Sequence, residues 1–342
     1  MDHIRILKRA FSITTSYRAL WIFGILVALT TGANPRVSGG SNGGGGSGGT
    51  GPGTFHWPEI SPDVLTGLIV AGVVSLCIVL LLAVAAAIAR YVAETALIRM
   101  VDQHEATGVK VSVRQGFRLG WSRAALRLFL MDFVIGLSVL IAFLLLLLLA
   151  ASPLLVWLTD STPARVLGTV VAVALAVVVI FVATVAGIAL SLLLQLWHRA
   201  VVLEDRNVNA AVRRGWQLLR QRLGDVVVMG LILFALGLAW TIVLVPVIFL
   251  LVAVAAIGGG LPALLVYAVG SLIAQGATPW IAAAIVGLPI FIVVMVIPLA
   301  VLGGLAQTFQ SSTWTLTYRE LLALEIARPA PGDQPPAPLP AA

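Results

Sequence analysis

The residues with the greatest potential for chemistry are Glu94, Gln195, His198 and Gln310, which lie near the ends of three long apolar runs. An ionisable group in or beside a membrane helix is costly unless it is paired, so such groups often mark functional sites. We predict that these residues form a polar collar where the runs meet, with Glu94 paired to His198 or to an arginine. The competing interpretation is that each helix end is solvated separately.

Catalytic and metal-binding patterns are absent from the sequence. The four histidines do not pair at metal-ligand spacing, and neither HExxH nor GxSxG occurs. Asp132 and Asp225 are further acidic candidates near the starts of apolar runs, and Cys77 has no second cysteine to pair with. We therefore predict no enzymatic activity, no metal and no cofactor.

The composition indicates which elements carry these polar residues. Apolar residues make up 60% of the 342 residues and charged residues 10%, whereas a soluble domain carries about 25% charged residues. With a mean hydropathy of +1.07, the chain is predicted to be an all-α, polytopic integral membrane protein. Apolar runs that are candidate spans lie near 19–31, 64–89, 128–151, 166–194, 226–252 and 281–306.

The first of these runs is short, and its basic flank also fits a signal peptide, which is the alternative to a retained span. Residues 38–53 are rich in Gly and Ser and are predicted to form a flexible external loop. Gly258–Gly260 and Pro262 are expected to break the fifth run, leaving 261–274 re-entrant, interfacial or spanning. Residues 328–342 form a Pro- and Ala-rich tail that we expect to be disordered and cytoplasmic, so 1–325 is the membrane domain.

The net charge of +7 is interpreted as a topology signal, not as a nucleic-acid signal. With six spans and an internal N-terminus, 19 of the 21 Lys and Arg residues fall on the cytoplasmic side. The sequence therefore predicts a multi-pass protein of a bacterial-type cytoplasmic (inner) membrane, with both termini cytoplasmic and no nucleic-acid partner.

Basic segments precede three pairs of spans and resemble one another. Residues 113–119 (VRQGFRL) match 212–218 (VRRGWQL), and 8–13 (KRAFSI) is a weaker copy. Each has apolar residues at helical spacing, which predicts three repeats of an amphipathic helix followed by a helical hairpin. Anionic lipid headgroups are the predicted partners, contacted by Arg114, Arg118, Arg213, Arg214 and Arg220, with Phe117, Trp121 and Trp216 inserted beneath them.

Two apolar motifs carry a resemblance. The segment ALWIFG at 19–24 and the segment FQSSTWTLTYRE at 309–320 resemble bacterial six-helix proteins of the glycerophosphoryl diester phosphodiesterase membrane-domain type. The similarity covers roughly residues 1–325. In that family a soluble phosphodiesterase domain sometimes follows the membrane domain, but the 23 residues after Arg319 contain no histidine. The resemblance therefore implies a membrane domain without the catalytic domain.

These observations favour a non-catalytic membrane module that organises lipid or partner proteins through its basic amphipathic helices. The alternative is a transporter or permease component for a small or lipidic substrate, which the prolines inside the spans allow. The sequence identifies neither a substrate nor a protein partner.

Overall fold

The computed structural model describes residues 1–31, 62–159, 161–205, 207–273, 276 and 278–326. These residues are almost entirely α-helical and include no strand, which confirms the predicted all-α class. The predicted Gly/Ser-rich loop at 38–53 and the predicted tail at 328–342 lie outside the described residues.

The helices follow a similar order three times over, a short helix and then two apolar helices, although in the first repeat α2 (13 residues) is no longer than α1 (14 residues). In chain order they are α1 (His3–Ser16), α2 (Ala19–Thr31), α3 (Pro62–Thr107), α4 (Val113–Gly120), α5 (Arg123–Ala151), the 3-10 helix η1 (Ser152–Leu158), α6 (Thr162–Leu203), α7 (Val208–Gln221), α8 (Leu223–Ile273) and α9 (Thr278–Ile326). This order is the one expected from the three basic segments and the runs that follow them.

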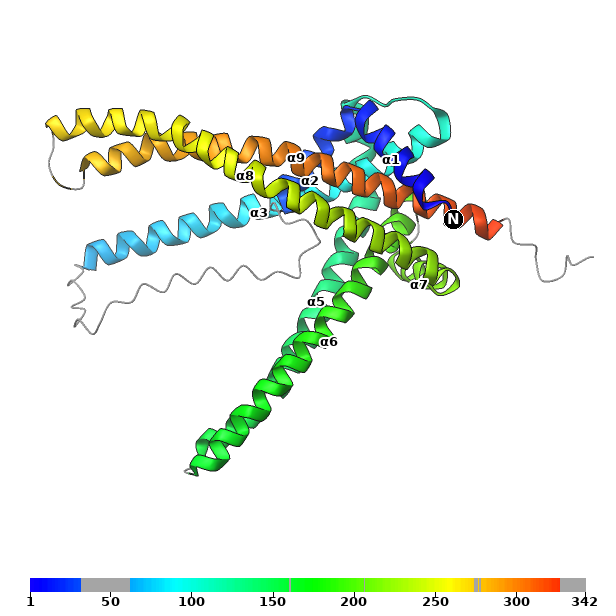
Figure 1. The fold of residues 1–342 in the computed structure, drawn as a ribbon, viewed down its shortest axis with the longest axis horizontal. Coiled ribbons are helices and arrows are strands. Elements are labelled where there is room, and N and C mark those ends of the chain that lie inside the picture. Colours follow the sequence, from blue (N-terminus) through cyan, green and yellow to red (C-terminus); the bar gives the residue numbers. More distant parts are fainter. Residues whose placement is uncertain (32–61, 160, 206, 274–275, 277, 327–342) are drawn as a thin grey trace, which may run out of the picture.

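The long helices extend from a common junction (Figure 1). Helices α8 and α9 form one arm, α5 and α6 form a second, and α3 extends as a separate helix beside the first arm. Helices α8 and α9 pack against each other along one arm, and α2 packs against α9 and α3. Helices α5 and α6 form a second hairpin, which diverges from the first arm. The short helices α1, α4 and α7 lie around the junction.

Among the described residues, five helices are long and apolar enough to cross a membrane, or six if α1 and α2 count as one bent span. These two helices meet at 98°. A helix rises about 1.5 Å per residue, so the 13 residues of α2 reach only about 20 Å, less than the roughly 30 Å hydrocarbon core of a bilayer. The first span is therefore marginal in length, as its sequence suggested.

Apolar side chains cover the outside of both arms. In each of the five candidate spans, at most 11% of an 18-residue apolar window is buried within the protein. Contiguous apolar surface of this extent is rare on soluble proteins and requires another apolar phase to cover it. This burial pattern fits a multi-pass membrane protein.

The expected break at Gly258–Gly260 is wrong, because α8 continues through these residues and through Pro262 to Ile273. The central glycine of the triplet serves packing: a Cβ on Gly259 would lie 2.7 Å from the carbonyl oxygen of Gly287, and a Cβ on Gly287 would lie 2.8 Å from that of Gly259. The absence of side chains at both positions lets α8 and α9 touch backbone to backbone. Close packing therefore overrides the low helix propensity of glycine.

Candidate functional site

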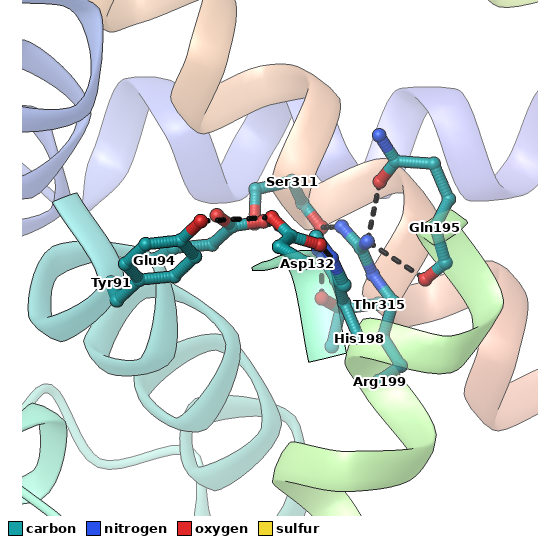
Figure 2. A network of polar contacts seen from close by, with 8 residues as sticks. All are labelled: Tyr91, Glu94, Asp132, Gln195, His198, Arg199, Ser311 and Thr315. Carbon is teal, nitrogen blue, oxygen red and sulfur yellow. Dashed lines mark hydrogen bonds and ion pairs between the residues drawn. The ribbon is translucent and has the colours of Figure 1, made fainter. Parts of the chain in front are cut away.

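A buried histidine joins three long helices at the junction (Figure 2). The His198 ring on α6 is fully buried. Its Nδ1 atom lies 2.8 Å from Glu94 Oε1 on α3, and its Nε2 atom lies 2.7 Å from Asp132 Oδ1 on α5. Tyr91 on α3 donates a hydrogen bond of 3.2 Å to the other Asp132 oxygen. The predicted pairing of Glu94 with His198 is thus confirmed.

The two carboxyl groups occupy opposite edges of the imidazole ring, and this arrangement determines what the cluster can do. An imidazole with protons on both nitrogens donates to both carboxyl groups at once. Because each ring nitrogen already contacts an oxygen, the ring offers no free ligand position for a metal. No group of side chains suited to a metal ion is found among the described residues. The geometry is that of a structural clamp between α3, α5 and α6.

A second buried cation follows directly in the chain. Arg199 is 2% exposed, and its guanidinium donates to the carbonyl oxygen of Gln195 at 2.8 Å, to the side-chain oxygen of Gln195, and to the carbonyl oxygen of Ser311 at 3.4 Å. Figure 2 shows this guanidinium between α6 and α9. Arg199 therefore ties α9 to the clamp.

The predicted polar collar exists as a spatial cluster. Glu94, Gln195 and Gln310 line one small cavity, together with Arg199 and Ser311, while His198 does not line the cavity but contacts Glu94. Parts of α3, α6 and α9 thus meet at this cavity, as expected. Sequence reasoning missed Asp132 as the second partner of the histidine and missed Arg199 and Ser311 altogether. Their signal was present in the sequence, since all three are polar residues next to or within apolar runs.

The short helices α4 and α7 dock on the junction through glycine. A Cβ on Gly116 would lie 2.5 Å from Met100 Sδ, and a Cβ on Gly215 would lie 2.3 Å from Trp197 Cδ1. These two glycines occupy the same position in the matching segments 113–119 and 212–218. The shared motif therefore sets which face of each short helix is buried.

The opposite faces of these helices carry the remaining predicted residues. Phe117, Trp121 and Trp216 are 43%, 72% and 52% exposed, and four predicted arginines are also exposed: Arg114, Arg118, Arg213 and Arg220. Residues three or four apart share a helix face, so the aromatic rings lie beside the arginines. Arg213 and Trp216 also line an open hollow of about 760 Å³ on α7.

Arg214 is an exception, because its guanidinium pairs within the protein; its predicted contact with lipid headgroups stays a prediction. Its guanidinium forms two hydrogen bonds with Glu325 of α9, at 2.9 and 2.5 Å, and lies 3.7 Å from Glu204. The hydrogen bond to Glu325 raises the pKa of Arg214. The side chain leaves α7 next to the buried Gly215, which directs it onto the protein.

Comparison with known families gives one match. Residues 8–318 match a family of unknown function, DUF7544. The match covers most of the chain, so the chain belongs to this family. Searches of curated proteins and of solved structures found no match. The resemblance to the glycerophosphoryl diester phosphodiesterase membrane domain is not tested by this match and stays a prediction.

Proposed function

We propose that this member of a family of unknown function is a non-catalytic membrane module that gathers anionic lipids at the cytoplasmic surface of a bacterial-type inner membrane. The observation that carries the proposal is the repeated design of α4 and α7. Each helix buries a glycine face on the junction and exposes arginines beside large aromatic rings.

Such a face suits the boundary between lipid headgroups and acyl chains. Aromatic rings partition into the interface, and arginine attracts the phosphates of anionic lipids. Each basic residue near an anionic leaflet contributes about 1 kcal/mol, which corresponds to about a fivefold preference for an anionic over a neutral lipid surface. The attraction is screened over about 10 Å at 0.1 M salt, so the preference should fall as salt rises.

The orientation belongs to the same proposal. Placing α1, α4 and α7 on the cytoplasmic side puts 19 of the 21 basic residues there, in agreement with the positive-inside rule. The same choice places both chain termini in the cytoplasm. Protein partners would then meet the module at its cytoplasmic surface.

Lipid selection by the full-length protein tests the proposal. The protein is reconstituted in nanodiscs of phosphatidylglycerol and phosphatidylcholine in equal parts, and native mass spectrometry measures the lipids that it retains. The double variant Arg213→Gln and Arg220→Gln should lose most of the phosphatidylglycerol enrichment. Arg127→Gln is the matched control, because it removes one positive charge from the same side of the membrane. The Arg127 guanidinium is already engaged within the protein, where it donates to the Asp205 carbonyl oxygen at 2.7 Å.

Two results would refute the proposal. The first is a wild-type protein that retains both lipids equally. The second is an Arg127→Gln variant that loses as much enrichment, charge for charge, as the α7 variant, because lipid selection would then follow net charge and not contact with the exposed face.

The transporter alternative is supported by a different observation, the polar cavity at the junction of α3, α6 and α9. A transporter or permease component would move a small or lipidic substrate across the bilayer. Protein-dependent transfer of a labelled phospholipid between the leaflets of sealed vesicles would support this alternative over the module. Transfer at the rate of protein-free vesicles would exclude it for that lipid.

A further inference from the structure

The cavity at the junction lies between α2, α3, α6 and α9 and is separate from the exposed faces of α4 and α7. Its volume is about 30 Å³, and a water molecule needs about 10–15 Å³ on this measure. The space therefore accommodates about two water-sized groups. The cavity is only partly enclosed, so a larger molecule can insert one end.

The cavity wall is built for negative oxygen atoms. It carries two guanidinium groups, three side-chain amides and one hydroxyl, which belong to Arg90, Arg199, Gln195, Gln307, Gln310 and Ser311. The one carboxyl group in the wall, Glu94, is engaged by His198 at 2.8 Å. Guanidinium groups bind phosphate through charge-assisted hydrogen bonds, and amides and hydroxyls add neutral donors.

Some of this hydrogen-bonding capacity is unused within the protein. In the part of the chain that the structure describes, Arg90 Nε and Ser311 Oγ are buried and have no hydrogen-bond partner. A buried polar atom without a partner is destabilising. Both atoms belong to residues that line the cavity, so an occupant with acceptor oxygens would satisfy them.

We propose that this cavity binds a phosphate group, with two of its oxygen atoms inserted between Arg90, Arg199 and Ser311. The apolar walls supplied by Val27 and Leu97 suit a phosphate that is attached to a lipid, while a free phosphate ion satisfies the same polar groups. Binding here does not depend on the exposed arginines of α4 and α7. The site can therefore be correct even if the proposed surface function fails, and the reverse also holds.

The test uses the full-length protein in detergent and two probes. The first probe is inorganic phosphate, titrated while the thermal unfolding midpoint is followed. The second is phosphatidic acid in detergent micelles, with phosphatidylcholine as the uncharged comparison. Arg90→Gln removes one wall cation and Ser311→Ala removes only a hydroxyl. Arg5→Gln removes the same charge from an exposed position on α1 and serves as the matched control.

Saturable binding of either phosphate probe supports the site. Arg90→Gln should weaken it by at least about tenfold, because a hydrogen bond to a charged group contributes about that factor or more. Ser311→Ala should weaken it by a few fold, and Arg5→Gln should leave it unchanged. Binding of phosphatidic acid that Arg90→Gln weakens but inorganic phosphate does not displace assigns the site to lipid headgroups, whereas displacement shows that the free ion occupies the same site.

The proposal is overturned if neither probe binds saturably, or if folded Arg90→Gln and Ser311→Ala proteins both bind as tightly as wild type. Circular dichroism confirms the fold of each variant before binding is measured. The α7 double variant Arg213→Gln and Arg220→Gln leaves the cavity lining unchanged. Loss of lipid enrichment in that variant, with unchanged binding of the two probes, would separate the two sites.

Discussion

Replacing His198 by leucine should destabilise the protein strongly, because His198 is the shared partner of two acidic side chains. The ring is fully buried, and the Glu94 and Asp132 side chains are each 13% exposed. Removing one partner of a buried ion pair costs about 3–5 kcal/mol, since the remaining charge is left without compensation. The slight exposure of both acids places the expected loss near the lower value, about 3 kcal/mol. Leucine is close in size, so packing contributes little to this loss.

The free energy of unfolding can be measured by equilibrium titration with sodium dodecyl sulfate in mixed micelles, followed by circular dichroism. Adding Glu94→Gln and Asp132→Asn to His198→Leu should recover more than half of the lost stability, because no unpaired acid then remains. A loss below about 1 kcal/mol for His198→Leu would refute the clamp, because that is the size expected for an ordinary surface contact. Failure of the triple variant to recover stability would refute the electrostatic reasoning.

Three further predictions concern packing, the α7 ion pair and topology. Gly215→Ala should lower the free energy of unfolding by about 1–3 kcal/mol because its Cβ overlaps a tryptophan ring of α6, whereas Gly224→Ala, with open space around it, should be neutral or slightly stabilising. A double-mutant cycle of Arg214→Gln and Glu325→Gln should give a coupling of about 1 kcal/mol, and a coupling near zero would contradict the bidentate contact. A cysteine placed at Ser47 in a cysteine-free background should react with an impermeant thiol reagent from outside intact cells, and reaction only after lysis would reverse the orientation.

The sequence predicts the clamp in part, because the position of a residue along a helix is easier to infer than its neighbour on another helix. Glu94 and His198 are polar residues at the ends of runs that must converge, so their pairing was predictable. Asp132 was recognised as an ionisable residue near the start of a run, yet nothing in the sequence specifies how α5 is rotated against α6. The rotation of one helix against another depends on side-chain packing along both.

Two neighbouring arginines of α7 show why the orientation of a side chain on a helix is difficult to predict from sequence. Arg213 and Arg214 are adjacent in a basic amphipathic pattern, and both were expected to face lipid headgroups. Neighbouring residues on a helix are about 100° apart, so one side chain leaves the protein and the other turns towards Glu325. The predicted helix break at the glycine triplet of α8 was wrong for a related reason. The low helix propensity of glycine is a local property, but the residue that packs against Gly259, Gly287, lies on α9.

If the exposed faces of α4 and α7 lie at the membrane surface, spin labels on those faces should report two distinct depths. Single cysteines at Phe117, Trp216, Arg114 and Arg213, in a cysteine-free background, are labelled in the reconstituted full-length protein. Power saturation with oxygen and with a water-soluble nickel complex then reports the depth of each label. We expect labels at 117 and 216 to lie below the phosphates and labels at 114 and 213 to lie at or above them. Equal accessibility of all four labels to the nickel complex would show that these faces do not lie in the membrane interface.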